Sequence, residues 1–366
     1  MSWRFITGLT VVLLSICMIK GISSAQIPFT FQIEKEGVIN TNTKSEPFNV
    51  RRYLSNNVNI NSGSLKGASR NCIVITGQGK QLILEFREDS LFPLHEVDFD
   101  FEPITMGPRF PMSVIGDFNN NGIDEIIIGL SKKILKTEWE DNQFITVEYE
   151  FPYYTYDCIT GDATNDGVDD VIIACLPEPI YDDPERARYE TYRIVLLNLI
   201  NDELEIIYDK KEDLDIGIST AIPPDFLVCA ADLDNSGTNE IVISEAQSDM
   251  STTGYRSFNW NKESRSFLAV KNFRIDEVIG FLFPFTNNGT TYINATEYLR
   301  NERGKSRQSI LLIRDETKYK ETIPFDKEAV YVYFSDTGLE GFLELSTTST
   351  DGNLSIKYRY FVLVNR

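Results

Sequence analysis

One nine-residue loop pattern, rich in side-chain oxygens, occurs three times in this chain. We name the copies loop 1 (117–125), loop 2 (162–170) and loop 3 (232–240). Aligned on the glycine at the sixth position, the copies share oxygen-bearing side chains at the first, third, fifth and ninth positions. A hard cation such as Ca²⁺ takes about six to eight oxygen ligands, and a tight turn whose alternate residues point inward supplies them. Three copies in one register therefore predict cation sites.

The elements that flank each loop must position these oxygens. Each copy is followed at once by a short run of mostly β-branched apolar residues, such as EIIIG from Glu125 and DVIIA from Asp170. Such runs are typical of strands that are buried on both faces. The first half of each loop resembles an EF-hand loop, but the last acid stands at the ninth position and a strand follows instead of a helix. The pattern predicts cation-binding turns inside hairpins.

These three segments resemble the FG-GAP/VCBS repeats, the calcium-loop blades found in integrin α-subunit heads and in many secreted proteins. The family pattern is roughly Asp-x-Asp/Asn-x-Asp/Asn-Gly-x-x-Asp before a buried strand, with one loop per propeller blade. The resemblance covers the three loop segments strongly and the rest of the mature chain weakly. It implies a β-propeller that binds calcium in its hairpin loops.

The resemblance also implies which atoms would hold each cation. The side chains are Asp117, Asn119, Asn121 and Glu125 in loop 1, Asp162, Thr164, Asp166 and Asp170 in loop 2, and Asp232, Asp234, Ser236 and Glu240 in loop 3, with the backbone carbonyls of Ile123, Val168 and Thr238 at the seventh position. Loop 1 offers two carboxylates where each of the others offers three, so charge ranks it weakest. For every loop, an Asx-type turn without metal is the alternative.

The spacing of the loops is that of a repeat protein. Two worn copies follow from Pro284 and Asp336, so five copies start at 117, 162, 232, 284 and 336, at intervals of 45, 70, 52 and 52 residues. One four-stranded propeller blade has about this length. The chain is therefore predicted to be all-β, a single propeller of six or seven four-stranded blades over 26–366, with an N-terminal strand completing the last blade. An array of β-sandwiches is the alternative.

The worn copies keep fewer ligands. Pro284 and Tyr292 stand at the first and ninth positions of one, which predicts a metal-free loop, and Gly338 replaces the third-position ligand of the other. Sequons that start at Asn288, Asn294 and Asn353 would be glycan acceptors on exposed loops in a eukaryotic secretory pathway.

The N-terminus is typical of a secretory signal peptide. Arg4 precedes the apolar stretch 5–19, and Ser23-Ser24-Ala25 is a small-residue cleavage site. Cleavage there predicts a signal peptide at 1–25, and the absence of a second long apolar run predicts no membrane insertion. We expect a secreted, extracellular protein, or one in the periplasm or on the cell surface of a bacterium.

The formal net charge is −20, and it becomes −22 once the two basic residues of the signal peptide are removed. Such acidity argues against nucleic acid and anionic membranes as partners. Part of it is accounted for by loop carboxylates.

Four cysteines remain in the mature chain: Cys72, Cys158, Cys175 and Cys229. Cys158 lies four residues before loop 2 and Cys175 five residues after it. If the loop joins antiparallel strands, these two side chains could face each other and form a disulfide worth about 3 kcal/mol. The alternative is four buried free thiols that pack as small apolar residues.

Enzyme signatures are few. His95 is the only histidine, and no nucleophile motif accompanies it, which argues against serine- or cysteine-type hydrolysis and against multi-histidine metal sites. Carboxylate pairs for glycoside hydrolysis remain open among 55 acids. Tyr153, Tyr154, Tyr156 and Trp260 could form a sugar platform or pack in the core.

Two function classes follow. The first, which the resemblance implies, is a secreted, calcium-stabilised propeller that binds an extracellular protein or carbohydrate. The alternative is an extracellular lyase or hydrolase that acts on polysaccharides from the same scaffold. Binding on a glycan array without product release favours the first, whereas cleaved oligosaccharide favours the second.

Overall fold

The computed structural model describes residues 29–40, 59–67, 72–77, 79–87, 90–100, 112–176, 193–200, 203–211, 227–245, 253–275, 278–287, 289–298, 306–314, 317–323, 330–336, 339–350 and 353–365. Within these ranges the regular elements are all β-strands, so the all-β prediction is confirmed there. None of the described residues forms a helix that could span a membrane. The signal peptide predicted at 1–25 lies outside the described residues.

The strands of the described residues form six four-stranded antiparallel sheets. Sheet 1 contains β2 (Asn59–Gly63), β3 (Cys72–Gly77), β4 (Lys80–Arg87) and β5 (Ser90–Asp98). Sheet 2 contains β6 (Met112–Gly116), β7 (Glu125–Leu130), β8 (Lys133–Glu140) and β9 (Gln143–Glu150). Sheet 3 contains β10 (Tyr154–Gly161), β11 (Asp170–Leu176), β12 (Arg193–Ile200) and β13 (Glu203–Lys211).

The second half of the chain repeats this plan, and the last sheet borrows a strand from the N-terminus. Sheet 4 contains β14 (Leu227–Ala231), β15 (Glu240–Glu245), β16 (Thr253–Asn261) and β17 (Ser266–Ile275). Sheet 5 contains β18 (Val278–Asn287), β19 (Thr290–Tyr298), β20 (Ser306–Arg314) and β21 (Thr317–Ile323). Sheet 6 contains β22 (Val330–Asp336), β23 (Leu339–Thr350), β24 (Asn353–Asn365) and β1 (Phe29–Asn40).

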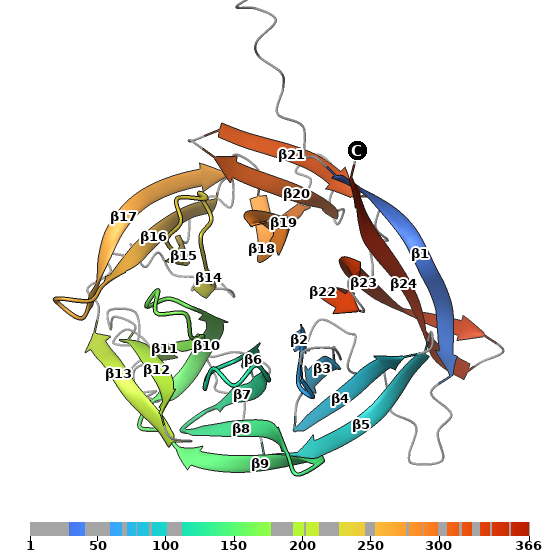
Figure 1. The fold of residues 1–366 in the computed structure, drawn as a ribbon, viewed down its shortest axis with the longest axis horizontal. Coiled ribbons are helices and arrows are strands. Elements are labelled where there is room, and N and C mark those ends of the chain that lie inside the picture. Colours follow the sequence, from blue (N-terminus) through green and yellow to red (C-terminus); the bar gives the residue numbers. More distant parts are fainter. Residues whose placement is uncertain are drawn as a thin grey trace, which may run out of the picture.

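The sheets stand around a common centre, with the first strand of each nearest the middle (Figure 1). These innermost strands contact their neighbours: β2 touches β22 and β6, β10 touches β6 and β14, and β14 touches β18. Loops 1, 2 and 3 each join the first strand of a sheet to its second strand. The three loops therefore lie at the same end of sheets 2, 3 and 4.

The second strand of sheet 2 shows why the apolar runs follow the loops. All six residues of β7 are buried. Ile126 and Ile128 pack in a core shared with sheet 1, whereas Ile127 packs in a core shared with sheet 3. Successive side chains of a strand point to opposite faces, so a strand between two sheets needs apolar residues at every position. Each fully buried isoleucine contributes roughly 2 kcal/mol, and this burial anchors the end of loop 1.

The N-terminal strand completes the last sheet, as the sequence predicts. β1 pairs with β24 in antiparallel register from Phe29 opposite Asn365 to Asn40 opposite Ser355. The pairing covers the edge of β24, which would otherwise present unpaired backbone groups. It also brings the first and the last of the described strands into one sheet.

The four cysteines of the described residues are buried thiols and form no disulfide. In the ladder between β10 and β11, Cys158 stands opposite Ile173 and Cys175 opposite Thr155. The two cysteines are therefore not direct cross-strand partners, and the disulfide considered for them is not formed. Burial raises the pKa of the Cys158 thiol well above its ordinary value, so this thiol is unreactive in the folded chain.

Candidate metal sites

The three loops share one backbone conformation. The residue at the fourth position has a left-handed conformation in each, with φ of 57° at Asn120, 55° at Asn165 and 59° at Asn235. The glycines at the sixth position have φ of 81°, 92° and 88°. Asparagine and glycine are the residues that adopt this region at least cost. The sequence repeat is therefore a repeat of one local structure.

The aspartate at the first position closes each turn. Asp117 accepts hydrogen bonds from the amide of Asn121 at Oδ1 (2.9 Å) and from the amide of Gly122 at Oδ2 (2.8 Å). Asp162 and Asp232 accept the same two bonds at 2.8 to 3.0 Å. A carboxylate oxygen that accepts one amide still has a free lone pair. The first-position acids are thus held in place and keep the capacity to bind a cation.

The third and fifth positions form Asx turns. The fifth-position side chain accepts the seventh-position amide at 2.7 Å in loop 1 and 3.0 Å in loop 2. The third-position side chain accepts the fifth-position amide at 3.1 Å in loop 1 and 3.0 Å in loop 3. These bonds belong equally to a metal-free Asx turn and to a preformed cation loop, so they do not separate the two interpretations.

The acid at the ninth position is buried in every loop. Glu125, Asp170 and Glu240 are 1%, 0% and 4% exposed. Glu125 accepts the amide of the second residue of its loop (3.0 Å), and Asp170 accepts the amide of the third (2.9 Å). Burial raises the pKa of Glu125 and that of Asp170 to about 7. A carboxylate withdrawn from water in this way gains from a neighbouring positive charge.

Loop 2 contains two buried oxygen atoms that form no hydrogen bond of normal geometry, although the Thr164 hydroxyl lies close enough to the Asp170 carboxylate to act to lower its pKa. They are Thr164 Oγ1 at the third position and Asp170 Oδ1 at the ninth. Thr164 is 5% exposed. A buried polar atom left without a partner costs about 1–3 kcal/mol. Both atoms belong to the ligand set that the sequence predicts, so the residues of loop 2 fit a hard, oxygen-preferring cation.

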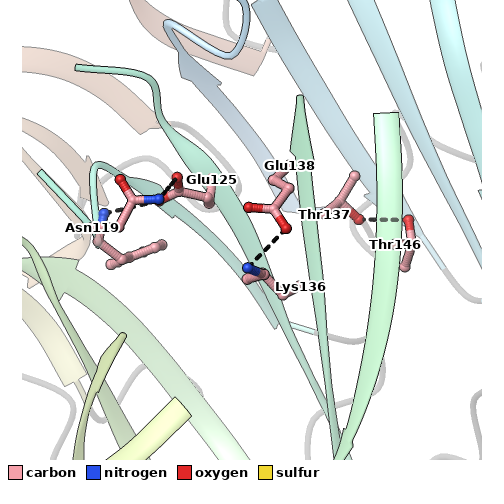
Figure 2. A network of polar contacts seen from close by, with 7 residues as sticks. Asn119, Glu125, Lys136, Thr137, Glu138 and Thr146 are labelled. Carbon is pink, nitrogen blue, oxygen red and sulfur yellow. Dashed lines mark hydrogen bonds and ion pairs between the residues drawn. The ribbon is translucent and has the colours of Figure 1, made fainter. Parts of the chain in front are cut away.

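No three acidic, histidine or cysteine side chains of the described residues converge as a ready metal site. In loop 1 the amide nitrogen Nδ2 of Asn119 donates to Glu125 Oε1 at 2.7 Å (Figure 2). An amide nitrogen therefore faces the ninth-position acid where the cation pattern needs an oxygen. Cation binding at loop 1 requires this side-chain amide to turn over, which adds to the charge argument that ranks loop 1 weakest.

Loop 1 also has a buried lysine nearby. Lys136 on β8 is 1% exposed, and its Nζ lies 2.9 Å from Glu138 Oε1. Figure 2 places this pair beside Glu125. The positive charge of Lys136 acts to lower the pKa of Glu125, but burial outweighs it. Leu196 and Ser257 occupy the matching third-strand positions of sheets 3 and 4. The sequence around Lys136 carries no sign of this burial, because a lysine in a strand is rarely buried.

Sheet 1 has a connection of the same length and different chemistry. β3 begins nine residues after the end of β2, at Cys72, which matches the loop spacing in sheets 2 to 4. Ser64 stands at the first position, Leu65 is buried at the second, and Lys66 occupies the third. The Lys66 ammonium lies 4.5 Å from the ring centroid of Trp139 on sheet 2. A lysine at a ligand position disfavours a cation, and the Lys66 side chain packs against the neighbouring sheet instead.

The two worn copies differ from the loops in local structure. β18 and β19 pair almost up to their connection, so Pro284 and Tyr292 lie within the ladder. The copy at Asp336 is likewise a tight hairpin in which Asp336 stands opposite Leu339. A ladder that continues through these positions leaves no open turn in which alternate side chains gather.

The sequons are placed differently from the expectation of exposed loops. Asn294 lies within β19, and Asn353 is the first residue of β24. Asn288 lies outside the described residues.

Four of the residues considered for catalysis and sugar stacking contact neighbouring side chains, namely His95, Tyr153, Tyr154 and Trp260, whereas the side chain of Tyr156 lies outside the described residues. The His95 ring lies 5.4 Å from that of Phe144, and burial lowers the pKa of His95. Trp260 packs edge-on against Tyr208 at 5.6 Å and borders a buried core. Tyr153 donates from its hydroxyl to an aspartate of β13 at 2.6 Å.

Comparisons with known proteins do not identify a family. No protein-family model matches the chain, and no curated protein matches it in sequence. Among solved structures, one similar chain comes from the "Cryo-EM structure of RAG in complex with one melted RSS and one unmelted RSS". It is 9% identical, with a TM-score of 0.49, over 92% of this chain and 100% of that chain. A likeness at this level carries no argument about function.

Proposed function

We propose that the chain is a secreted β-propeller that holds calcium in loops 1, 2 and 3 and binds an extracellular protein or carbohydrate. The observation that carries the calcium sites is the pair of buried, neighbouring oxygens on Thr164 and Asp170, which form no hydrogen bond of normal geometry. Loops 1 and 3 have the same backbone as loop 2, so the proposal extends to them.

Two observations support a propeller. The innermost strands of successive sheets touch one another from β22 through β2, β6, β10 and β14 to β18. The pairing of β1 with β24 ties the N-terminus to the last sheet. In this interpretation each of the six sheets is one blade, and radial repetition leaves only short, protected edges.

Calcium in these loops serves the fold. A bound cation supplies the positive charge that compensates the ninth-position carboxylates for their burial. Glu125 and Asp170 hold their oxygens near the turn through backbone amides, and the first-position aspartates hold the other side of the same turn. The chain thus presents preformed oxygen ligands, and binding to the folded state stabilises it by about 2.7 kcal/mol per site at a hundredfold excess over Kd.

The exposed positions of the three loops form the surface that we expect to contact a partner. The fifth and sixth positions of all three loops are exposed, while the second and ninth are buried. Cations that order these loops would therefore order a surface of amide, hydroxyl and carboxylate groups. The net charge of −20 favours a protein or glycan partner over a polyanion.

Thermal unfolding with and without chelator tests the calcium sites. We expect the midpoint to fall on chelation, to recover with Ca²⁺, and to recover much less with Mg²⁺, which demands a tight octahedral shell. The double variant Asp162→Ala and Asp170→Ala should remove part of the recovery. Ser64→Ala, at the first position of the matching loop in sheet 1, should remove none of it. A midpoint indifferent to chelator at every calcium concentration contradicts the proposal.

A glycan array and a panel of extracellular proteins, probed with the calcium-loaded chain, test recognition. Retention that is lost on chelation supports a binding module whose loops must be ordered. Release of cleaved oligosaccharide from an array glycan would instead support the enzyme alternative.

A further inference from the structure

The eighth position of each loop carries a polar side chain that the cation pattern does not use. Each contacts the first residue of the connection in the preceding sheet. Asp124 Oδ2 accepts the amide of Ser64 at 2.5 Å, and Asp169 Oδ2 accepts the amide of Asp117 at 3.1 Å. In loop 3 the direction reverses, because Asn239 Nδ2 donates to the carbonyl of the first residue of loop 2 at 2.9 Å. Neighbouring loops are therefore joined directly.

Loops 2 and 3 have a second connection. The side chain of Asn165, at the fourth position of loop 2, bonds both backbone groups of Asn239. Its Oδ1 accepts the Asn239 amide at 2.7 Å, and its Nδ2 donates to the Asn239 carbonyl at 3.2 Å. Three hydrogen bonds thus fix Asn239 against loop 2, whereas a single bond joins Asp169 of loop 2 to loop 1.

Asn239 lies between two predicted cation ligands of its own loop, so its bonds connect those ligands to loop 2. Its chain neighbours are Thr238, whose carbonyl is a predicted ligand, and Glu240, the buried ninth-position acid. Any adjustment of these two groups around a cation moves the residue between them. That residue bonds the backbone carbonyl of Asp162, the first ligand of loop 2. The Asn239 side chain therefore links the ligand-bearing backbone of loop 3 directly to the first ligand residue of loop 2.

Glycines before loops 1 and 2 allow the neighbouring segments to approach closely, which leaves little room for one to move without the other. A Cβ atom added at Gly161, which directly precedes loop 2, would lie 2.3 Å from the carbonyl oxygen of Ala230 in sheet 4. At Gly116, before loop 1, it would lie 2.8 Å from Asp169 Oδ2. Glycine at these positions allows the backbone of one loop to touch the next, so there is no solvent layer between the loops at these points to absorb a displacement.

We propose that loops 2 and 3 bind their cations cooperatively, with Asn165 and Asn239 as the positioning residues that couple them. This inference rests on the cation sites proposed above. Occupation of one loop holds Asn239 and the turn of loop 2 in the geometry that the other cation needs, so the second cation binds with less ordering left to do. We expect each cation to raise the affinity of the other about tenfold, within the usual range of coupling between sites.

The chain contains a matched control for this connection. Asn235, at the fourth position of loop 3, makes the same pair of bonds with the backbone of Thr291 in sheet 5, at 2.7 and 3.3 Å. The hairpin that contains Thr291 is one of the worn copies and holds no predicted cation site. A variant at Asn235 therefore breaks an equivalent inter-sheet contact without separating two cation loops.

Calcium titration by calorimetry in the Asp117→Ala background, which disables loop 1, measures the coupling. Adding Asp232→Ala leaves only loop 2, and adding Asp162→Ala instead leaves only loop 3. The coupling factor is the overall two-site binding constant divided by the product of the two single-site constants, and we expect about ten. Asn165→Gly retains the left-handed backbone and should bring the factor to about one. Asn235→Gly should leave it unchanged.

Asn239→Ala provides a second variant, because it removes the bond to loop 2 from the other side and should also lower the factor. A factor near one in the parent, with both cations still bound, overturns the cooperative inference and leaves the proposed cation sites standing. A factor that survives both Asn165→Gly and Asn239→Ala overturns the assigned route. Absence of any calcium binding in the unaltered chain overturns the inference and the proposed function together.

Discussion

Asp170→Asn in loop 2 tests whether the buried acids hold cations or merely close turns. The carboxyl group is fully buried, and one of its oxygens forms no hydrogen bond of normal geometry. Asparagine has nearly the same shape, keeps an acceptor for the Thr164 amide, and offers an amide nitrogen near the Thr164 hydroxyl. The substitution therefore removes the charge and a cation ligand while it preserves the packing.

The structure sets the size of the effect in cation-free protein. Burial raises the pKa of Asp170 from 3.8 to about 7. Because the folded value lies above the unfolded one, the protonated acid stabilises the fold fully below pH 3.8, and this contribution is lost as the pH rises through about 7. The ionised form at about pH 8 is then disfavoured by roughly 4 kcal/mol. Burial of the amide offsets part of this gain, so we expect Asp170→Asn to be about 2 kcal/mol more stable in chelator at that pH.

Calcium should reverse the order. The unaltered chain gains about 2.7 kcal/mol at loop 2 at a hundredfold excess of calcium over Kd, whereas the variant lacks the ligand and gains less. The assay is denaturant unfolding followed by far-UV circular dichroism in chelator and in calcium, at about pH 5 and about pH 8. At about pH 5 in chelator, the two proteins should have similar free energies of unfolding, because Asp170 in the folded state is then protonated.

Asp166→Asn is the control, because it removes an exposed acid from the same loop and should change stability little in chelator. Two results would refute the reasoning. One is an Asp170→Asn variant that is less stable than the parent in chelator at the higher pH. The other is an Asp170→Asn variant whose free energy of unfolding rises in calcium as much as that of the unaltered chain.

Three further outcomes test the packing around the loops. Gly161→Ala should cost about 3 kcal/mol or more in thermal unfolding, because its Cβ would meet a carbonyl oxygen of sheet 4. Gly67→Ala, whose Cβ would meet no atom of the described residues within 4 Å, should cost only about 1 kcal/mol of backbone strain. Lys136→Met leaves a half-buried carboxylate without its ion-pair partner and should cost about 1–3 kcal/mol, whereas the exposed Lys133→Met should leave the unfolding midpoint unchanged; equal effects would contradict the burial argument. A chain that starts after β1 exposes the edge of β24 and should elute from a sizing column as aggregate; a stable monomer would show that the N-terminal strand is dispensable.

The local structure of the loops could be predicted from sequence because its causes are local. The first-position aspartates bond amides four and five residues ahead, and the Asx turns span two residues. The left-handed positions carry asparagine and glycine, which are the residues that permit them. The β-branched runs predicted the buried second strands, since a strand between two packed sheets needs apolar side chains on both faces. An N-terminal strand in the last sheet was also predictable, because the final repeat has only three strands of its own.

Other features were decided by contacts between residues far apart in the chain. The bond between Asn165 and Asn239 joins residues 74 positions apart, and no local pattern distinguishes this asparagine from Asn120 at the same position of loop 1. Lys136 has an ordinary place in the third strand of its sheet, on the same face of β8 as Ile134, which packs in the core shared with sheet 3. The thiols of Cys158 and Cys175 were candidates for a disulfide by spacing, but ladder register set them against other residues.

The sequence by itself determined three turns of one conformation and the strands that follow them, because backbone preference and short-range hydrogen bonds act within a few residues. Only the tertiary structure decided which oxygens in those turns are buried without a hydrogen bond of normal geometry and which loops touch. Both properties depend on desolvation by neighbouring sheets, and desolvation depends on chain segments that are distant in sequence.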